Sequence, residues 1–236
     1  MSARRADTPR TRADFLAAQG VLLVVRDTPA AAPPVPGQPA AVPGNPAEGP
    51  EILLALWDDG SVTALNGHVD LGTGLATALS QIVAEELDAP LSQVHMVLGD
   101  TARAPNQGAT IASASIQIHS APLRRAAAQA RAWLLAQASE HFGVMPSLLQ
   151  VREGRIHAGE GHAIDMGRVV AGRGTRLALA PDAPVKPVQD YRVVGTPVPR
   201  VDIPAKLSGE MVFVHDMRLP GMLHGRVVRP PYAGAD

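Results

Sequence analysis

One periodic segment constrains the fold of this chain more than any other feature. Between residues 75 and 87, apolar side chains recur at the three- and four-residue spacing of an amphipathic helix. The positions are Leu75, Ala78, Leu79, Ile82, Val83 and Leu87. Asp88 and Pro90 end the pattern, because proline cannot continue a helix. A helix with one apolar face needs another element to cover that face.

Strand-like segments flank this helix and supply that cover. Residues 52–57 and 61–66 are short apolar runs on either side of an Asp-Gly turn signal, and residues 94–98 follow the helix as a buried strand. A second, alanine-rich helix is expected over residues 111–142, with Gly143 as its stop. We therefore predict an α+β fold in which a mixed sheet packs against two main helices.

The charged side chains of both helices are expected to face solvent. Glu85 and Glu86 lie away from the apolar face of the first helix, where they would be solvated or act as cap partners. Arg124, Arg125 and Arg131 fall on the expected solvent side of the second helix.

Weaker patterns follow the second helix. Residues 148–157 resemble a hairpin, and a short helix is expected near residues 166–171. Further along, residues 192–194, 211–214 and 222–229 are strand-like runs broken by glycine and proline. We expect this tail to differ in character from the domain before it.

A proline-rich segment divides the chain near its start. Residues 28–50 carry eight of the 22 prolines, which remove backbone donors and favour extended geometry. We expect an arm and linker over residues 1–50, an α+β domain over residues 51–187 and a separate tail over residues 188–236. Residues 15–25 are interpreted as a strand or arm, although the arginines before them resemble a signal peptide loosely.

Composition excludes several classes of function. The 21 basic and 22 acidic residues nearly cancel, so nothing favours nucleic acid or an anionic membrane surface as a partner. The chain has no cysteine, which excludes disulfides, thiolate metal sites and iron–sulfur ligation by its own side chains. No apolar run reaches the roughly 18 residues of a membrane span. We expect a cytoplasmic protein, with periplasmic export as the alternative.

A glycine pair stands directly before the first helix. In Gly72-Thr73-Gly74 the glycines let a ligand approach the backbone, and unpaired N–H groups at a helix start attract phosphate or carbonyl oxygens. Thr73 is able to cap the helix or to bind the ligand. The alternative is an ordinary turn.

A run of small and hydroxyl residues marks the expected start of the second helix. Residues 108–115 read Gly-Ala-Thr-Ile-Ala-Ser-Ala-Ser, and such a stretch presents backbone N–H groups and hydroxyls to a polar ligand without obstruction. A tightly packed helix start is the alternative.

Other chemistries find no support. The eight histidines are scattered without metal-ligand spacing, His157 and His162 being the nearest pair, so each is interpreted as a surface or satisfied core histidine. No serine lies in a nucleophile elbow. We assign no catalytic residue and no metal ligand.

Taken in order, these segments resemble the molybdopterin-binding domains of the xanthine dehydrogenase and aldehyde oxidoreductase family. The likeness lies in residues 67–74 (Gly-His-Val-Asp-Leu-Gly-Thr-Gly), 78–87, 99–101 and 110–115. Many members have Gln at the position of Thr73, whereas the branch of nicotinate dehydrogenase and isoquinoline 1-oxidoreductase large subunits commonly has threonine there. The chain is therefore most similar to that branch.

The tail carries a second likeness. Residues 191–195, 199–206 and 220–231 resemble the opening of the α/β hammerhead domain of the same family. The resemblance implies that the chain corresponds to the amino-terminal portion of a large subunit and that an incomplete hammerhead domain occupies residues 188–236.

The resemblance also implies a cofactor site. In the family, the glycine-rich and small-residue segments contact the cofactor through backbone amides and hydroxyls. Carried over by position, the contacts are Gly72, Thr73, Gly74, Thr110, Ala112, Ser113, Ala114 and Ser115. The implied cofactor is molybdopterin, as such or in its cytosine dinucleotide form, held only in a complete assembly.

The implied activity is hydroxylation of an N-heteroaromatic or aldehyde substrate with oxygen taken from water. The implied partners are an iron–sulfur small subunit and the remaining carboxyl-terminal portion of the large subunit, which carries the catalytic glutamate of the family. The chain alone is not expected to be active. The alternative is a non-catalytic α/β interaction module or remnant that binds no cofactor.

Overall fold

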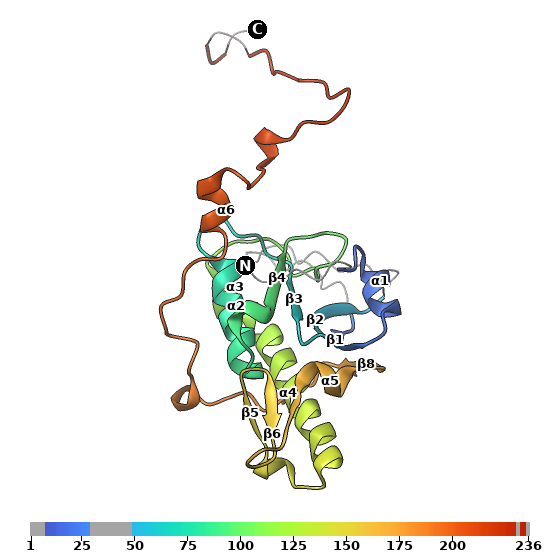
Figure 1. Cartoon of the computed structure of the whole chain (residues 1–236). Coiled ribbons are helices and arrows are strands. Elements are labelled where there is room, and N and C mark those ends of the chain that lie inside the picture. The colour runs from blue at the N-terminus through green and yellow to red at the C-terminus, as the bar shows by residue number, and fades with distance from the viewer. Residues whose placement is uncertain (1–7, 29–48, 230–231, 235–236) are drawn as a thin grey trace. The chain divides into compact units, whose positions relative to one another are not determined.

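The computed structural model describes residues 8–28, 49–229 and 232–234 (Figure 1). The chain forms two compact units, and the division falls between Val201 and Asp202. This division lies later than the expected boundary after residue 187, because residues 188–201 remain bound to the first unit by hydrogen bonds described below. The eight-proline segment lies almost entirely outside the described residues.

A mixed five-stranded sheet forms the centre of the first unit, in the order β4-β3-β2-β1-β8. The strands are β1 (Val21–Arg26), β2 (Glu51–Trp57), β3 (Val62–Asn66), β4 (Val94–Leu98) and β8 (Gly174–Ala178). The pairs β1–β2 and β2–β3 are antiparallel, whereas β3–β4 and β1–β8 are parallel. This mixture, packed against two main helices, confirms the predicted α+β fold.

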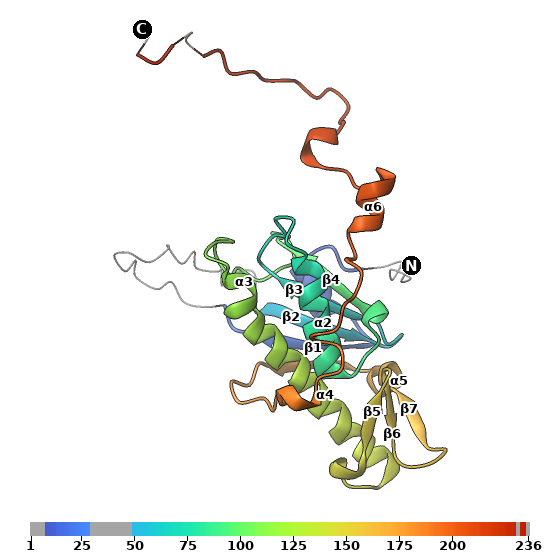
Figure 2. The ribbon, with the colours of Figure 1, turned by 90° about the vertical axis from the view of Figure 1, so that its left-hand side faces the viewer.

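The two main helices lie on the same face of the sheet, and the short helix α1 lies on the other (Figures 1 and 2). These helices are α2 (Leu75–Leu87), α4 (Ser120–Phe142) and α1 (Arg12–Ala17). Because side chains alternate along a strand, Leu22 and Val24 pack towards α2 and α4, while Val21, Leu23 and Val25 pack towards Phe15 of α1. Both faces of β1 are therefore buried.

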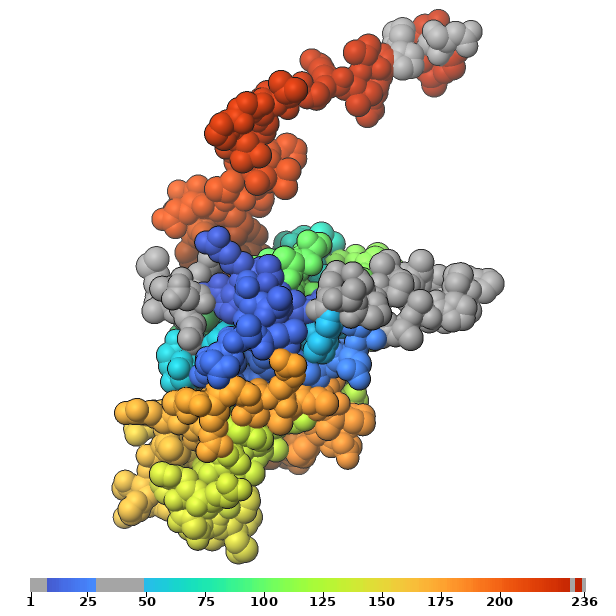
Figure 3. All heavy atoms as spheres, turned by 90° about the vertical axis from the view of Figure 1, so that its right-hand side faces the viewer, coloured from blue at the N-terminus to red at the C-terminus, as the bar shows by residue number. Residues whose placement is uncertain are grey.

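The strand β1 belongs to the central sheet and not to an arm outside it. It pairs with β2 on one side and β8 on the other, so residues before the proline-rich segment share the sheet with residues after it. Figure 3 shows the amino-terminal residues, in blue, next to the orange residues around β8. Neither α1 nor β8 was predicted; β8 is an edge strand whose residues are only half-buried or exposed.

The long helix begins later than predicted. Instead of one helix over residues 111–142, the chain forms α3 (Ala114–Gln117) and then α4. The N–H groups of Ile118 and His119 both reach the Ala114 carbonyl, which ends the first helix. Gly143 is the stop as predicted, with a left-handed backbone (φ 67°).

The strand β4 lies at the sheet edge and, apart from Val94, is only partly buried.

A small antiparallel sheet follows α4. It contains the predicted hairpin, β5 (Gln150–Arg152) and β6 (Arg155–His157), together with β7 (Ala163–Asp165). The predicted short helix forms as α5 (Met166–Val170).

The second unit contains α6 (Ile203–Ser208) and the short turn η5 (Val214–Asp216). Its described residues form no strand, so the strands expected at 211–214 and 222–229 are absent, as is the one at 192–194 in the first unit. A strand needs a paired neighbour for its backbone groups, and these segments have none among the described residues. The incomplete hammerhead domain remains a prediction.

No helix within the described ranges is both long and apolar enough to cross a lipid bilayer.

Candidate functional site

A strap, here defined as residues 183–201, is held along α2 by hydrogen bonds over the length of the helix. Near the carboxyl end of α2, three successive backbone N–H groups of the strap reach Glu85. Further along, Gln81 donates to the carbonyl of Val193. Near the amino end, the N–H of Val201 donates to the Thr77 hydroxyl at 3.0 Å, and Arg200 donates to the Gly72 carbonyl at 2.8 Å. The strap therefore links the two ends of α2.

Glu85 and Glu86 are buried, which corrects the prediction that they face solvent. The residues are 2% and 1% exposed. Oε2 of Glu85 accepts from the N–H groups of residues 192–194 at 2.6–2.9 Å, and Oε1 lies 3.3 Å from the Lys186 ammonium. Burial by itself raises the pKa of Glu85, but these hydrogen bonds and Lys186 outweigh it and hold the pKa below its ordinary value.

Two arginines predicted to be in solvent are partly buried in ion pairs. Arg124 lies 2.6 Å from Glu86, and Arg131 lies 3.0 Å from Asp88, while Arg125 is exposed as predicted. Buried carboxylates are stable only when charged donors surround them, so the helix face that looked polar is instead an internal interface.

The predicted glycine loop is organised by Asp70. Its carboxylate accepts hydrogen bonds from the N–H groups of Gly72 at 2.9 Å, Gly74 at 3.2 Å and Ala76 at 3.1 Å. Burial raises the pKa of Asp70, but these bonds and one from the Thr73 N–H outweigh it, so the pKa lies below its ordinary value. Both glycines are left-handed, with φ of 91° and 79°.

These contacts correct one expectation. The N–H groups at the start of α2 are not unpaired, because Asp70 occupies them. Thr73 does not cap the helix; the N-cap residue is Gly74, without a side-chain cap. The side chain of Thr73 is exposed, and a Cβ placed on Gly72 would meet no atom within 4 Å. A ligand at this loop would therefore find open space beside Gly72 and the Thr73 hydroxyl. It would not find free N–H groups at the start of α2.

The small-residue segment has an unusual backbone. Ala112 and Ser113 are both left-handed, with φ of 54° and 53°. For residues with a Cβ this conformation costs about 1 kcal/mol or more each, and such strain concentrates at functional sites. Ala112 and Ser113 are exposed, whereas Thr110, Ala114 and Ser115 are half-buried. Within the part of the chain that the structure describes, the hydroxyls of Ser113 and Ser115 have no hydrogen-bond partner.

The structure brings the two predicted segments together. The Val69 N–H donates to the Thr110 hydroxyl at 3.1 Å, and the Gly67 N–H donates to the Gln107 side chain at 2.7 Å. The approach is close, because a Cβ on Gly67 would lie 2.1 Å from the Pro105 carbonyl oxygen. The glycine loop and the small-residue segment thus form one surface, here called the two-loop surface: residues 67–74 and 105–115.

A pair of histidines, the buried His68 and the half-buried His119, was not predicted from the sequence. His68 is fully buried, its ring centroid is 4.2 Å from that of His119, and neither of its ring nitrogens has a hydrogen-bond partner among the described residues. The side chains of Asn66 and Gln107 both donate to the His119 carbonyl at 3.3 Å. His68 is therefore not the satisfied core histidine that was expected.

Burial is the main cause of a lowered pKa in both histidines. The neighbouring His119 lowers the pKa of His68 further, and Arg26 does the same for His119. Both rings therefore favour the neutral form. Within the described ranges, the histidine pair included, no three His, Asp or Glu side chains gather in a way that would hold a metal ion.

The chain is similar to several known proteins. Residues 16–191 match the family model of the molybdopterin cofactor-binding domain. A nicotinate dehydrogenase subunit from Pseudomonas putida KT2440 is 54% identical over 228 residues, which cover 96% of this chain and 19% of that protein. The beta subunit of isoquinoline 1-oxidoreductase from Brevundimonas diminuta is 29% identical over 229 residues, covering 80% of this chain and 29% of that protein.

Among solved structures, CO dehydrogenase from Oligotropha carboxidovorans aligns with a TM-score of 0.44 and 26% identity, over 49% of this chain and 15% of that one. The chain spans less than a third of the length of the curated relatives named above.

The fold and the two-loop surface define an α+β domain with a small-residue face at the amino-terminal end of α2. With three-quarters of its length matched, the chain belongs to the molybdopterin cofactor-binding domain family. Within this family it is a homologue of the nicotinate dehydrogenase subunit from Pseudomonas putida.

Proposed function

We propose that the two-loop surface binds part of the molybdopterin cofactor in the large subunit of a molybdenum hydroxylase. The observation that carries the proposal is the hydrogen bond between Val69 and Thr110, which joins two segments 41 residues apart into one small-residue surface. The proposed contacts are the residues that the family resemblance implies: Gly72, Thr73, Gly74, Thr110, Ala112, Ser113, Ala114 and Ser115.

The residues on this surface fit a polar cofactor with phosphate and pterin groups. The space beside Gly72 is open, and the hydroxyls of Thr73, Ser113 and Ser115 are available as donors. Thr110 has a second role besides contact with the cofactor, because its hydroxyl accepts from Val69 and so holds the loops together, while its own hydrogen remains able to donate. The small side chains of Ala112 and Ala114 leave the neighbouring backbone accessible. Asp70 already accepts from the N–H groups at the start of α2, so hydroxyl groups would hold the cofactor instead.

When bound, the molybdenum cofactor supplies the oxygen-transfer chemistry, and the residues of this chain orient it. Glu85 and Glu86 are unsuited to proton transfer because both are committed to holding the strap. The general base would come from another part of the large subunit.

The proposed substrate class is N-heteroaromatic, with aldehydes as the alternative. The names of two relatives, a nicotinate dehydrogenase and an isoquinoline 1-oxidoreductase, support this class. Because this chain has no cysteine, the iron–sulfur clusters that accept electrons would lie on a partner subunit. The remainder of the large subunit would be the second partner.

The test is the pterin and molybdenum content of the chain, purified alone and after co-expression with the remaining large-subunit segments and an iron–sulfur subunit. We expect stoichiometric pterin in the co-expressed assembly. An assembly that forms and contains no pterin would contradict the proposal and leave the interaction module as the function.

A further inference from the structure

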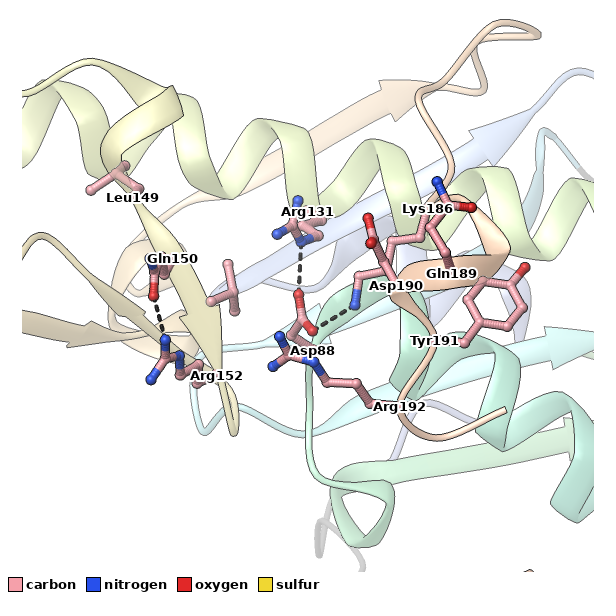
Figure 4. Close-up of a pocket in the computed structure, with 11 residues that line it drawn as sticks. Asp88, Arg131, Leu149, Gln150, Arg152, Lys186, Gln189, Asp190, Tyr191 and Arg192 are labelled. Atoms are coloured by element: carbon pink, nitrogen blue, oxygen red, sulfur yellow. Dashed lines mark hydrogen bonds and ion pairs between the residues drawn. The ribbon is translucent and has the colours of Figure 1, made fainter. Parts of the chain in front are cut away.

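A pocket lies at the carboxyl end of α2, beside Asp88, and has a volume of about 420 Å³ (Figure 4). The helix has 13 residues, so Asp88 is roughly 20 Å from the glycine loop at the other end. The walls come from α4, from the small sheet and from the strap. Its place and its residues are therefore separate from the two-loop surface.

The pocket is lined by more basic than acidic side chains. The basic ones are Arg131, Arg152, Lys186 and Arg192, and the acidic ones are Asp88 and Asp190. With the ordinary charge of each group, the lining carries two net positive charges.

Asp88 fixes two of these cations in place. Its carboxylate lies 3.0 Å from Arg131 and 2.5 Å from Lys186, and Figure 4 shows both side chains converging on it. Asp88 itself has a left-handed backbone (φ 52°) and ends α2. Lys186 also lies 3.3 Å from the buried Glu85 carboxylate, so these two cations and two carboxylates balance in charge.

The other two cations have no carboxylate partner within the described ranges. Arg152 donates to the Gln150 side chain at 2.6 Å, which is neutral, and the side chain of Arg192 forms no ion pair there. The backbone N–H of Arg192 donates to Glu85. A guanidinium group presents several N–H donors in a plane that matches a carboxylate or phosphate group.

We propose that this pocket binds a small oxyanion carrying carboxylate or phosphate groups. Arg152 and Arg192 would donate to the oxyanion, and Arg131 and Lys186, held by Asp88, would form the adjoining wall of the pocket. Because the strap contributes Lys186 and Arg192, a bound anion would also stabilise the strap against α2. The proposal does not depend on cofactor binding at the other end of the helix.

The test is titration of the purified full chain with inorganic phosphate and, separately, with malonate, at constant ionic strength. Binding is followed by calorimetry and by the midpoint of thermal unfolding. We expect saturable binding of at least one probe and a rise of the midpoint with its concentration. Phosphate binding alone would identify a phosphate site, and malonate binding alone a carboxylate site. Absence of binding by both would overturn the proposal.

Substitution distinguishes the pocket from general charge effects. The variant R152S/R192S removes two exposed side chains and keeps the backbone contacts of the strap, so we expect it to fold and to bind the probe at least ~10-fold more weakly. The matched control is Arg125→Ser, which removes an exposed arginine of α4 outside the pocket. Equal weakening in both variants, or no weakening in the double variant, would overturn the proposal. Circular dichroism of each variant checks its fold.

Discussion

Asp70 shows how a single side chain organises the start of α2. Its carboxylate accepts from the N–H groups of Gly72, Gly74 and Ala76 at 2.9–3.2 Å, and both glycines have a left-handed backbone. From the sequence, these N–H groups were expected to be free for a ligand. The pattern of a helix start does not reveal which upstream side chain turns back to accept from them.

Replacing Asp70 by alanine is therefore expected to destabilise the chain by about 1–2 kcal/mol, the usual cost of losing a helix cap. Asp70→Asn keeps one acceptor oxygen and should cost less. Urea unfolding at neutral pH measures both free energies. Equal stability of D70A and the unaltered chain would show that Asp70 does not hold the loop.

Gly67 is expected to tolerate no side chain. A Cβ there would lie 2.1 Å from a backbone oxygen of Pro105, so the small-residue segment would have to move. We expect Gly67→Ala to lower the free energy of unfolding by about 2 kcal/mol or more. Gly225→Ala is the control, because no atom lies within 4 Å of its added Cβ. Similar unfolding midpoints for both variants would contradict the close approach of the two loops.

His68 gives the stability of the chain a pH dependence. Its pKa is lowered from the ordinary 6.5 by burial, so the folded state favours the neutral ring and the unfolded state binds more protons as pH falls. The free energy of unfolding should therefore be highest above about pH 6.5 and should decline below that pH. His68→Phe should show a smaller decline between pH 7.5 and 5.5, whereas His162→Phe, at an exposed position, should behave as the unaltered chain. An identical pH profile for H68F would contradict this role.

At the scale of elements, the sequence predicted those segments whose periodicity is strong. The helix α2, the strands β2 and β3 and the stop of α4 at Gly143 all form as expected. The misses have physical causes. β8 is an edge strand with little apolar signal, and α3 separates from α4 through a local turn that alanine-rich sequence does not mark.

The sequence did not predict the strap, because charged and polar groups make its contacts with α2. Hydrophobic periodicity assigns Glu85 to solvent, yet the strap covers it and supplies three backbone donors and Lys186. Long-range partners of a polar side chain cannot be read from local pattern. The same reason explains why Arg124 and Arg131 were placed in solvent.

Glu85→Gln is therefore expected to cost about 3 kcal/mol at neutral pH, because it leaves buried donors without a charged acceptor. The pKa of Glu85 is lowered from 4.5 in the folded state, so its contribution is present above that value and is lost as pH falls through the folded pKa. The difference between E85Q and the unaltered chain should then shrink towards pH 3. Glu140→Gln, at an exposed position of α4, is the control in urea unfolding at both pH values. A cost for E85Q no larger than that of E140Q would contradict the interface.

At the scale of the whole molecule, the sequence predicted which two segments form the proposed cofactor site, and the role of their residues in binding stays a prediction. Small and hydroxyl residues beside glycines stand out in the sequence, and the structure brings both segments together through Val69 and Thr110. The left-handed backbone of Ala112 and Ser113 and the buried His68 could not be predicted. None of these three residue types signals such features, which arise from packing between distant segments.

The most direct test of the proposed site is the pterin and molybdenum content of the assembly that carries Ser113→Asp. Aspartate tolerates the left-handed backbone, so the fold should persist, while its carboxylate would repel a phosphate-bearing cofactor. Ser147→Asp, at an exposed position in the turn before β5, is the matched control. We predict that pterin falls at least ~10-fold in S113D and stays unchanged in S147D. Full pterin occupancy in a folded S113D assembly would contradict cofactor binding at the two-loop surface.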